Sequence, residues 1–93
     1  MSDSEILSIL KMSLQNPPGV LDDYLLTLMQ GAEAEIAEKG ISLDKSSIED
    51  VNLIVMYASW RYLKRNGDKG MPRSLRYALH SRLISEKGKV NAE

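Results

Sequence analysis

Apolar residues recur at helical intervals in four segments of this chain, and prolines or glycines separate the segments. The first, residues 3–14, begins directly after Ser2, which has capping-box spacing with Glu5 in the first turn. The second, residues 20–39, begins after two prolines and ends before Gly40, a common terminating residue. Each is a predicted helix with one apolar face, which in the second consists of Leu21, Leu25, Leu28, Met29, Ala32 and Ile36.

The third segment, residues 47–66, is the most apolar part of the chain. Ser46 and Glu49 have capping-box spacing and predict where this helix begins. Between positions 51 and 60 only Asn52 and Ser59 are polar, so the helix is apolar on nearly every side. We therefore expect it to be the central helix, covered on most sides by the other three.

The fourth segment, residues 72–87, opens with Pro72, which is favoured at the first position of a helix. Its inner seam is predicted to consist of leucines four residues apart, Leu75, Leu79 and Leu83. Residues 88–93 follow as a predicted frayed tail. Since no segment alternates like a strand, the sequence predicts one all-α domain over residues 1–93, a small four-helix domain with a central buried third helix.

The composition is that of an ordinary globular domain, with 43% hydrophobic and 27% charged residues among 93. The chain has no cysteine, which excludes disulfides and thiolate metal sites. The longest apolar run, residues 53–58, is too short to cross a bilayer, so no membrane association is expected. The acidic start at residues 1–5 is unlike a signal peptide, and we expect a protein made in a cytoplasm.

Charge is divided unevenly along the chain although the total is only −1 at pH 7. Residues 1–50 contain ten acidic and three basic side chains, whereas residues 51–93 contain three acidic and nine basic ones. The halves either neutralise each other within one fold or form opposite surfaces for head-to-tail assembly or nucleic-acid binding. Glu35 and Lys39, at i and i+4, are expected to pair locally on the second helix.

The residues that could carry catalysis form no recognisable motif. His80 is the only histidine, and no carboxylate lies near it in sequence to complete a metal site or a catalytic group. Asp22 and Asp23 are adjacent on a helix and therefore point about 100° apart, and both suit the first turn of the helix dipole. The glycines match no phosphate-binding loop. We expect no catalytic residue, no metal, no cofactor and no enzymatic activity.

One constellation suggests function, because basic residues alternate with aromatic ones along the third and fourth helices. A protein interface explains it best, since interfaces concentrate Arg, Tyr and Trp and the chain's pI is only about 5.8. The alternative is a small helical nucleic-acid-binding module that uses these same bases. The constellation consists of Arg61, Lys64, Arg65, Lys69, Arg73 and Arg76 with Tyr57, Trp60, Tyr62 and Tyr77.

Four short stretches occur in an order that is similar to a known family. They are residues 21–26 (LDDYLL), 31–36 (GAEAEI), 56–62 (MYASWRY) and 71–76 (MPRSLR). In this order they resemble the small head-tail connector, or adaptor, proteins of long-tailed bacteriophages and prophages. The similarity spans roughly residues 20–85, nearly the whole predicted core.

The resemblance implies a non-enzymatic adaptor of the virion, made in the bacterial host and assembled as a dodecameric ring beneath the portal protein. Such a ring joins the DNA-filled head to downstream connector or tail proteins, and DNA passes through it without sequence-specific binding. By this resemblance, acidic residues of the second helix face a basic surface of the neighbouring subunit in the ring, and the basic residues contact the neighbour or the portal. The interface residues so implied are Asp22, Asp23, Glu33, Arg61, Lys64, Arg65, Arg73 and Arg76.

Overall fold

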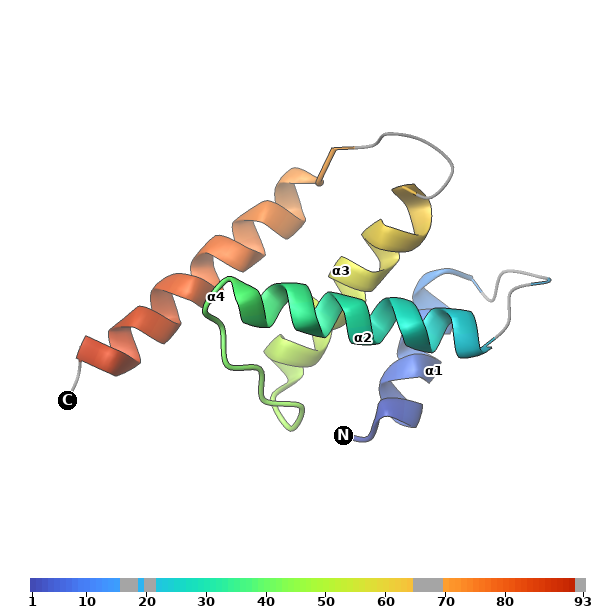
Figure 1. The fold of residues 1–93 in the computed structure, drawn as a ribbon, viewed down its shortest axis with the longest axis horizontal. Helices are drawn as coiled ribbons and strands as arrows, with labels where there is room; N and C mark the ends of the chain where they lie inside the picture. Colours follow the sequence, from blue (N-terminus) through green and yellow to red (C-terminus); the bar gives the residue numbers. More distant parts are fainter. Residues whose placement is uncertain (16–18, 20–21, 65–69, 92–93) are drawn as a thin grey trace.

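The computed structural model describes residues 1–15, 19, 22–64 and 70–91, and all regular structure within them is helical (Figure 1). This confirms the all-α fold class and the four helices expected from the sequence. The helices are α1 (Asp3–Ser13), α2 (Asp22–Glu38), α3 (Ile48–Lys64) and α4 (Arg73–Asn91).

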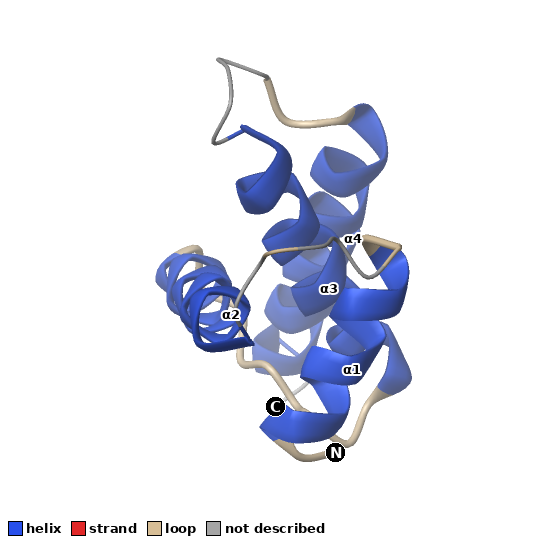
Figure 2. Cartoon of the chain, turned by 90° about the vertical axis from the view of Figure 1, so that its right-hand side faces the viewer, coloured by secondary structure: helices blue, strands red, loops and turns tan. Residues whose placement is uncertain are grey.

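Helix α3 lies at the centre of the domain, as its apolar sequence predicts. Each of the other three helices packs against it, and α2 also packs against α1. Figure 2 shows α2 nearly end-on while α1 and α3 are seen from the side, so α2 crosses both. The arrangement leaves α4 attached to the domain mainly through α3.

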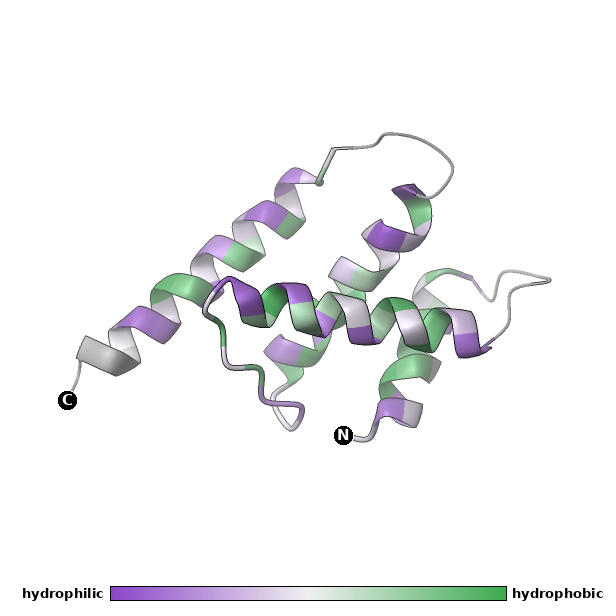
Figure 3. Ribbon diagram, in the orientation of Figure 1, coloured by the Kyte–Doolittle hydropathy of each residue, from purple (hydrophilic) through white to green (hydrophobic). Residues whose placement is uncertain are grey.

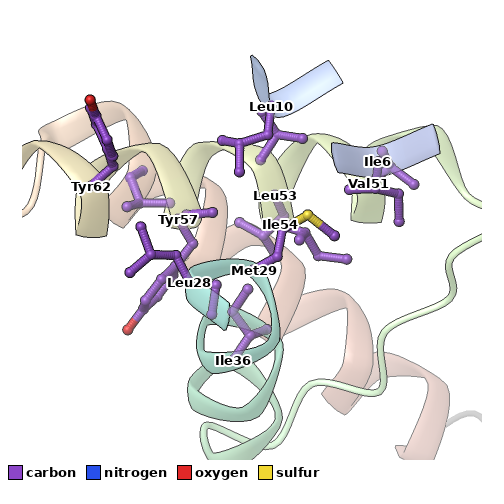
Figure 4. Packing of buried hydrophobic residues seen from close by; sticks show 14 of the residues in the cluster. Ile6, Leu10, Leu28, Met29, Ile36, Val51, Leu53, Ile54, Tyr57 and Tyr62 are labelled. Atoms are coloured by element: carbon purple, nitrogen blue, oxygen red, sulfur yellow. The ribbon is translucent and has the colours of Figure 1, made fainter. Parts of the chain in front are cut away.

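The core consists of aliphatic side chains from all four helices, supplemented by Met29 and two tyrosines of α3 (Figure 4). Complete burial of each large aliphatic side chain contributes about 1.5–3 kcal/mol, which makes this cluster the main stabilising feature of the fold. Its largest fully buried members are Ile6, Leu10, Leu25, Met29, Ile36, Ile54 and Leu75.

Two helix starts test the capping patterns read from the sequence. At α1 the Ser2–Glu5 capping box is present: Glu5 N donates to Ser2 Oγ at 3.2 Å and Ser2 N donates to Glu5 Oε1 at 3.1 Å. At α3 the expected pair of Ser46 with Glu49 is wrong. Ser47 occupies the capping position and accepts from Asp50 N at 3.5 Å, because Ser46 N is held by the side chain of Asp44 in the preceding turn.

The helix bounds differ from expectation chiefly at the C-terminus. Helix α4 runs from Arg73 to Asn91 instead of over 72–87, so a frayed tail from residue 88 is wrong. Gly88 is exposed within the helix and costs only about 1 kcal/mol there, which the adjoining turns tolerate. Helix α1 ends one residue before the expected 14. The expected ends of the second and third helices at residues 20 and 66, and residues 92–93, lie outside the described residues.

Candidate functional site

The strongest polar feature is an ion pair between α3 and α4 that the sequence did not reveal. Asp50 is 2% exposed, and its carboxylate accepts hydrogen bonds from Arg82 Nε at 2.7 Å and Arg82 Nη2 at 3.2 Å. Asp44 N also donates to this carboxylate, at 2.8 Å. Arg82 further donates to Ser42 O at 2.7 Å and to Glu86 at 3.1 Å, and the hydrogen bonds to Asp50 raise the pKa of the guanidinium.

A second ion pair joins α2 to α3 and uses residues from two of the family-like stretches. The Arg61 guanidinium contacts the carboxylate of Glu35, which is therefore not held in the local pair with Lys39 expected from the sequence. Gly31 provides the room, since a Cβ there would lie 2.8 Å from Arg61 Nη2. Arg61 Nε is buried without a hydrogen-bond partner in the described structure. Arg61 is thus engaged within the chain, with 26% of its side chain exposed.

Two acidic interface candidates, Glu33 and Asp22, are paired within the chain. Lys45 Nζ lies 2.8 Å from both Asp3 Oδ1 and Glu33 Oε1, and hydrogen bonding to Asp3, followed by the interaction with Glu33, raises the pKa of the Lys45 ammonium. Asp22 Oδ1 lies 3.0 Å from Lys11 Nζ, which joins α2 to α1. Much of the acidic half is therefore neutralised internally.

The aromatic residues of α3 belong to the packing of that helix. Tyr57 and Trp60 meet edge to face, with ring centroids 5.5 Å apart, and Lys64 Nζ lies 4.3 Å from the Trp60 ring centroid. Burial, and then the negative charge of Glu35, raise the pKa of Tyr57. Lys64 thus lies beside Trp60 at the exposed end of the helix.

Four of the predicted interface residues combine exposure with the lack of an ion pair in the described structure: Asp23, Lys64, Arg73 and Arg76, of which Lys64 lies against the Trp60 ring. Asp23 lies on the outer face of α2, and Arg73 and Arg76 lie on exposed faces of α4. Arg65 lies outside the described residues. The structure does not bring the seven described candidates together as one site; it divides them between internal ion pairs and separate exposed helix faces.

Helix α4 presents unusually large exposed apolar side chains. Tyr77 is 72% exposed and Ile84 is 57% exposed, both on the side of the helix opposite Leu75. Figure 3 shows hydrophilic and hydrophobic residues mixed along this helix instead of separated cleanly. The sequence analysis grouped Arg73, Arg76 and Tyr77 but missed Ile84, although its spacing of seven residues from Tyr77 places it on the same helix face.

A groove of about 480 Å³ lies between α3 and α4 beside the buried ion pair. Its lining mixes charged, polar and apolar side chains, among them Asp50, Arg82, Asn52, Met56 and Ala78. In the described part of the chain no three His, Cys, Asp or Glu side chains cluster so as to hold a metal ion. No described helix is both long and apolar enough to cross a membrane.

Comparison with known proteins adds no assignment: no family model, curated protein or solved structure matches this chain.

Proposed function

We propose that this chain is a structural adaptor that works by binding protein subunits, specifically a head-tail connector of a tailed phage or prophage. In this role it forms a ring under the portal protein and joins the DNA-filled head to the tail. It acts as a component of the virion, made in the host cytoplasm, without enzymatic activity or a cofactor.

The observation that carries the proposal is the exposed outer side of α4. Among the α4 residues whose side chains the structure describes, only Leu75 and Leu79 are buried, and the helix presents Tyr77, Ile84, Arg73 and Arg76 to solvent; neither arginine is in an ion pair with another described residue. Aromatic, aliphatic and arginine side chains placed together are what protein interfaces concentrate. A long helix fixed along one side and open along the other is suited to binding another subunit.

The packing of the family-like stretches supports the resemblance. Gly31 and Glu35 come from one stretch and Arg61 from another, and the three residues meet where α2 crosses α3. Two of the four stretches therefore meet at one physical contact between α2 and α3.

The internal pairing of bases argues against the nucleic-acid-binding alternative. Arg61 and Arg82 from the basic half are both bound to carboxylates, so less positive charge is exposed than the sequence suggests. A DNA-binding module loses affinity steeply as salt rises because each phosphate contact releases counterions. We expect only weak duplex DNA binding, without sequence preference.

The test is co-purification with the portal protein encoded in the same gene cluster. The tagged chain is co-expressed with that portal, and the complex is measured by light scattering and electron microscopy. We expect a discrete complex with the adaptor as a ring on one end of the portal, weakened by the double substitution Arg73→Glu with Arg76→Glu. The control, Ser4→Glu with Ser8→Glu on exposed positions of α1, should bind normally. A portal that never binds the adaptor contradicts the proposal.

A further inference from the structure

The outer side of α4 carries a regular row of exposed side chains. The row follows the i, i+4, i+7, i+11, i+14 spacing that places residues on one face of a helix, opposite the face that Leu75 and Leu79 bury. The residues at its two ends are basic, and the side chains between them are large. We call it the α4 row; its members are Arg73, Tyr77, His80, Ile84 and Lys87.

The outer side of α2 carries a second exposed row with the opposite character. Its spacing is i, i+4, i+7, i+11, i+15, and it faces away from the side that Leu25, Ala32 and Ile36 bury. Its end residues are acidic, and the side chains between them are smaller than those between the ends of the α4 row. We call it the α2 row; its members are Asp23, Thr27, Gln30, Ala34 and Glu38.

The two rows match in length, charge and shape. The end charges are 14 residues apart in the α4 row and 15 apart in the α2 row, which corresponds to roughly 21 Å and 22.5 Å along a helix. None of the four end residues is in an ion pair within the described structure: Arg73, Lys87, Asp23 and Glu38. The large side chains at positions 77 and 84 fit opposite the small ones at 27 and 34, as ridges of one helix fit grooves of another.

We propose that the α4 row of one copy packs against the α2 row of a second copy. When two copies are joined in this way, the α2 row of one and the α4 row of the other stay unused. The contact is therefore head to tail, and its repetition gives a ring or a chain. The inference rests on the proposed adaptor function for its biological purpose. Its test uses this chain alone, so a failure of self-association is distinguishable from a failure of portal binding.

Disulfide trapping tests the contact directly, because the natural chain has no cysteine. His80 is the midpoint of the α4 row and Gln30 lies at the midpoint of the α2 row, so they face each other whether the helices pack parallel or antiparallel. We expect the double variant Gln30→Cys with His80→Cys to form a ladder of disulfide-linked multimers under mild oxidation. The matched control, Gln30→Cys with Ser81→Cys, moves one thiol about 100° around α4 and should remain mostly monomeric. Equal ladders, or none for the first variant, overturn the proposal.

Charge reversal provides the second test. One variant makes the α4 row acidic (Arg73→Glu with Lys87→Glu), and the other makes the α2 row basic (Asp23→Lys with Glu38→Lys). We expect each variant alone to be monomeric and their equimolar mixture to associate, since every contact in an alternating assembly then joins opposite charges.

Three results overturn the proposal. The first is a wild-type chain that stays monomeric up to about 1 mM, where even a weak specific contact is populated. The second is self-association that survives in either variant. The third is duplex DNA binding without multimers, lost when the α4 row is made acidic and retained when the α2 row is made basic. This result would assign the α4 row to nucleic acid.

Discussion

Replacing Asp50 with alanine should cost more stability than any other single loss of a polar side chain in this domain. The substitution leaves the Arg82 guanidinium, whose side chain is 11% exposed, without its main counter-charge. It also leaves Asp44 N without its acceptor. Breaking a buried ion pair from one side typically costs about 3–5 kcal/mol, a large part of the roughly 5–14 kcal/mol expected for a domain of this size.

The assay is urea unfolding followed by circular dichroism and by the fluorescence of the single tryptophan. With a denaturant slope of about 1–2 kcal/mol/M, a loss of about 3 kcal/mol lowers the midpoint by about 1.5–3 M. Amide hydrogen exchange should accelerate most in α4, because the lost pair joins that helix to α3. The matched control is Glu49→Ala, an exposed acid one residue earlier, which should cost about 0.5 kcal/mol or less.

A double-mutant cycle decides whether the ion pair is the cause. Adding Arg82→Met to Asp50→Ala removes the stranded charge, so the double variant should be more stable than the Asp50→Ala single variant, with a coupling of about 1.5–3 kcal/mol. The reasoning is refuted if the losses in free energy of unfolding of the two single variants add in the double variant. It is also refuted if the free energy of unfolding of Asp50→Ala lies within about 1 kcal/mol of that of the natural chain.

Three further outcomes are expected. Gly31→Ala should force Arg61 away from Glu35, so Arg61→Ala should cost at least about 0.5 kcal/mol less in that background; an unchanged cost by urea unfolding contradicts this. The folded chain holds the Lys45 proton more tightly than the unfolded chain, so this stabilisation is complete below the ordinary pKa of 10.5 and is lost as pH rises through the raised value. Lys45→Met should therefore lose less stability than the natural chain in alkaline titration, and parallel curves count against the assignment. Ser2→Ala should cost about 1 kcal/mol in thermal unfolding, and no change would show that the cap is dispensable.

The fold was predictable where local pattern decides the structure. Periodicity located the four helices and the burial of Leu75 and Leu79, because the spacing of apolar residues within an amphipathic helix identifies its buried face without reference to distant parts of the sequence. The start of α3 was misplaced by one residue because two serines in succession both satisfy the capping pattern there. Only the side chain of Asp44 selects between them, by holding Ser46 in the turn.

The candidate site was less predictable because its charges find partners far away in sequence. Arg61 and Glu35 are 26 positions apart, and Arg82 and Asp50 are 32 apart. Sequence rules address pairs three or four residues apart, so they assigned Glu35 to Lys39 and attached no importance to Asp50. The exposed row on α4 was partly visible from spacing, but its exposure depends on which face α3 covers.

The leucines of α4 repeat every four residues, at 75, 79 and 83, so apolar packing alone does not fix how α4 is aligned along α3. If α4 slid along α3 by one turn, about 6 Å, each leucine would take the place of the next and apolar packing would hardly distinguish the two alignments. Arg82 has no such substitute one turn away. Its bonds to Asp50 form in only one alignment, so this pair sets the register of α4 and thereby the height at which its outer side chains are displayed.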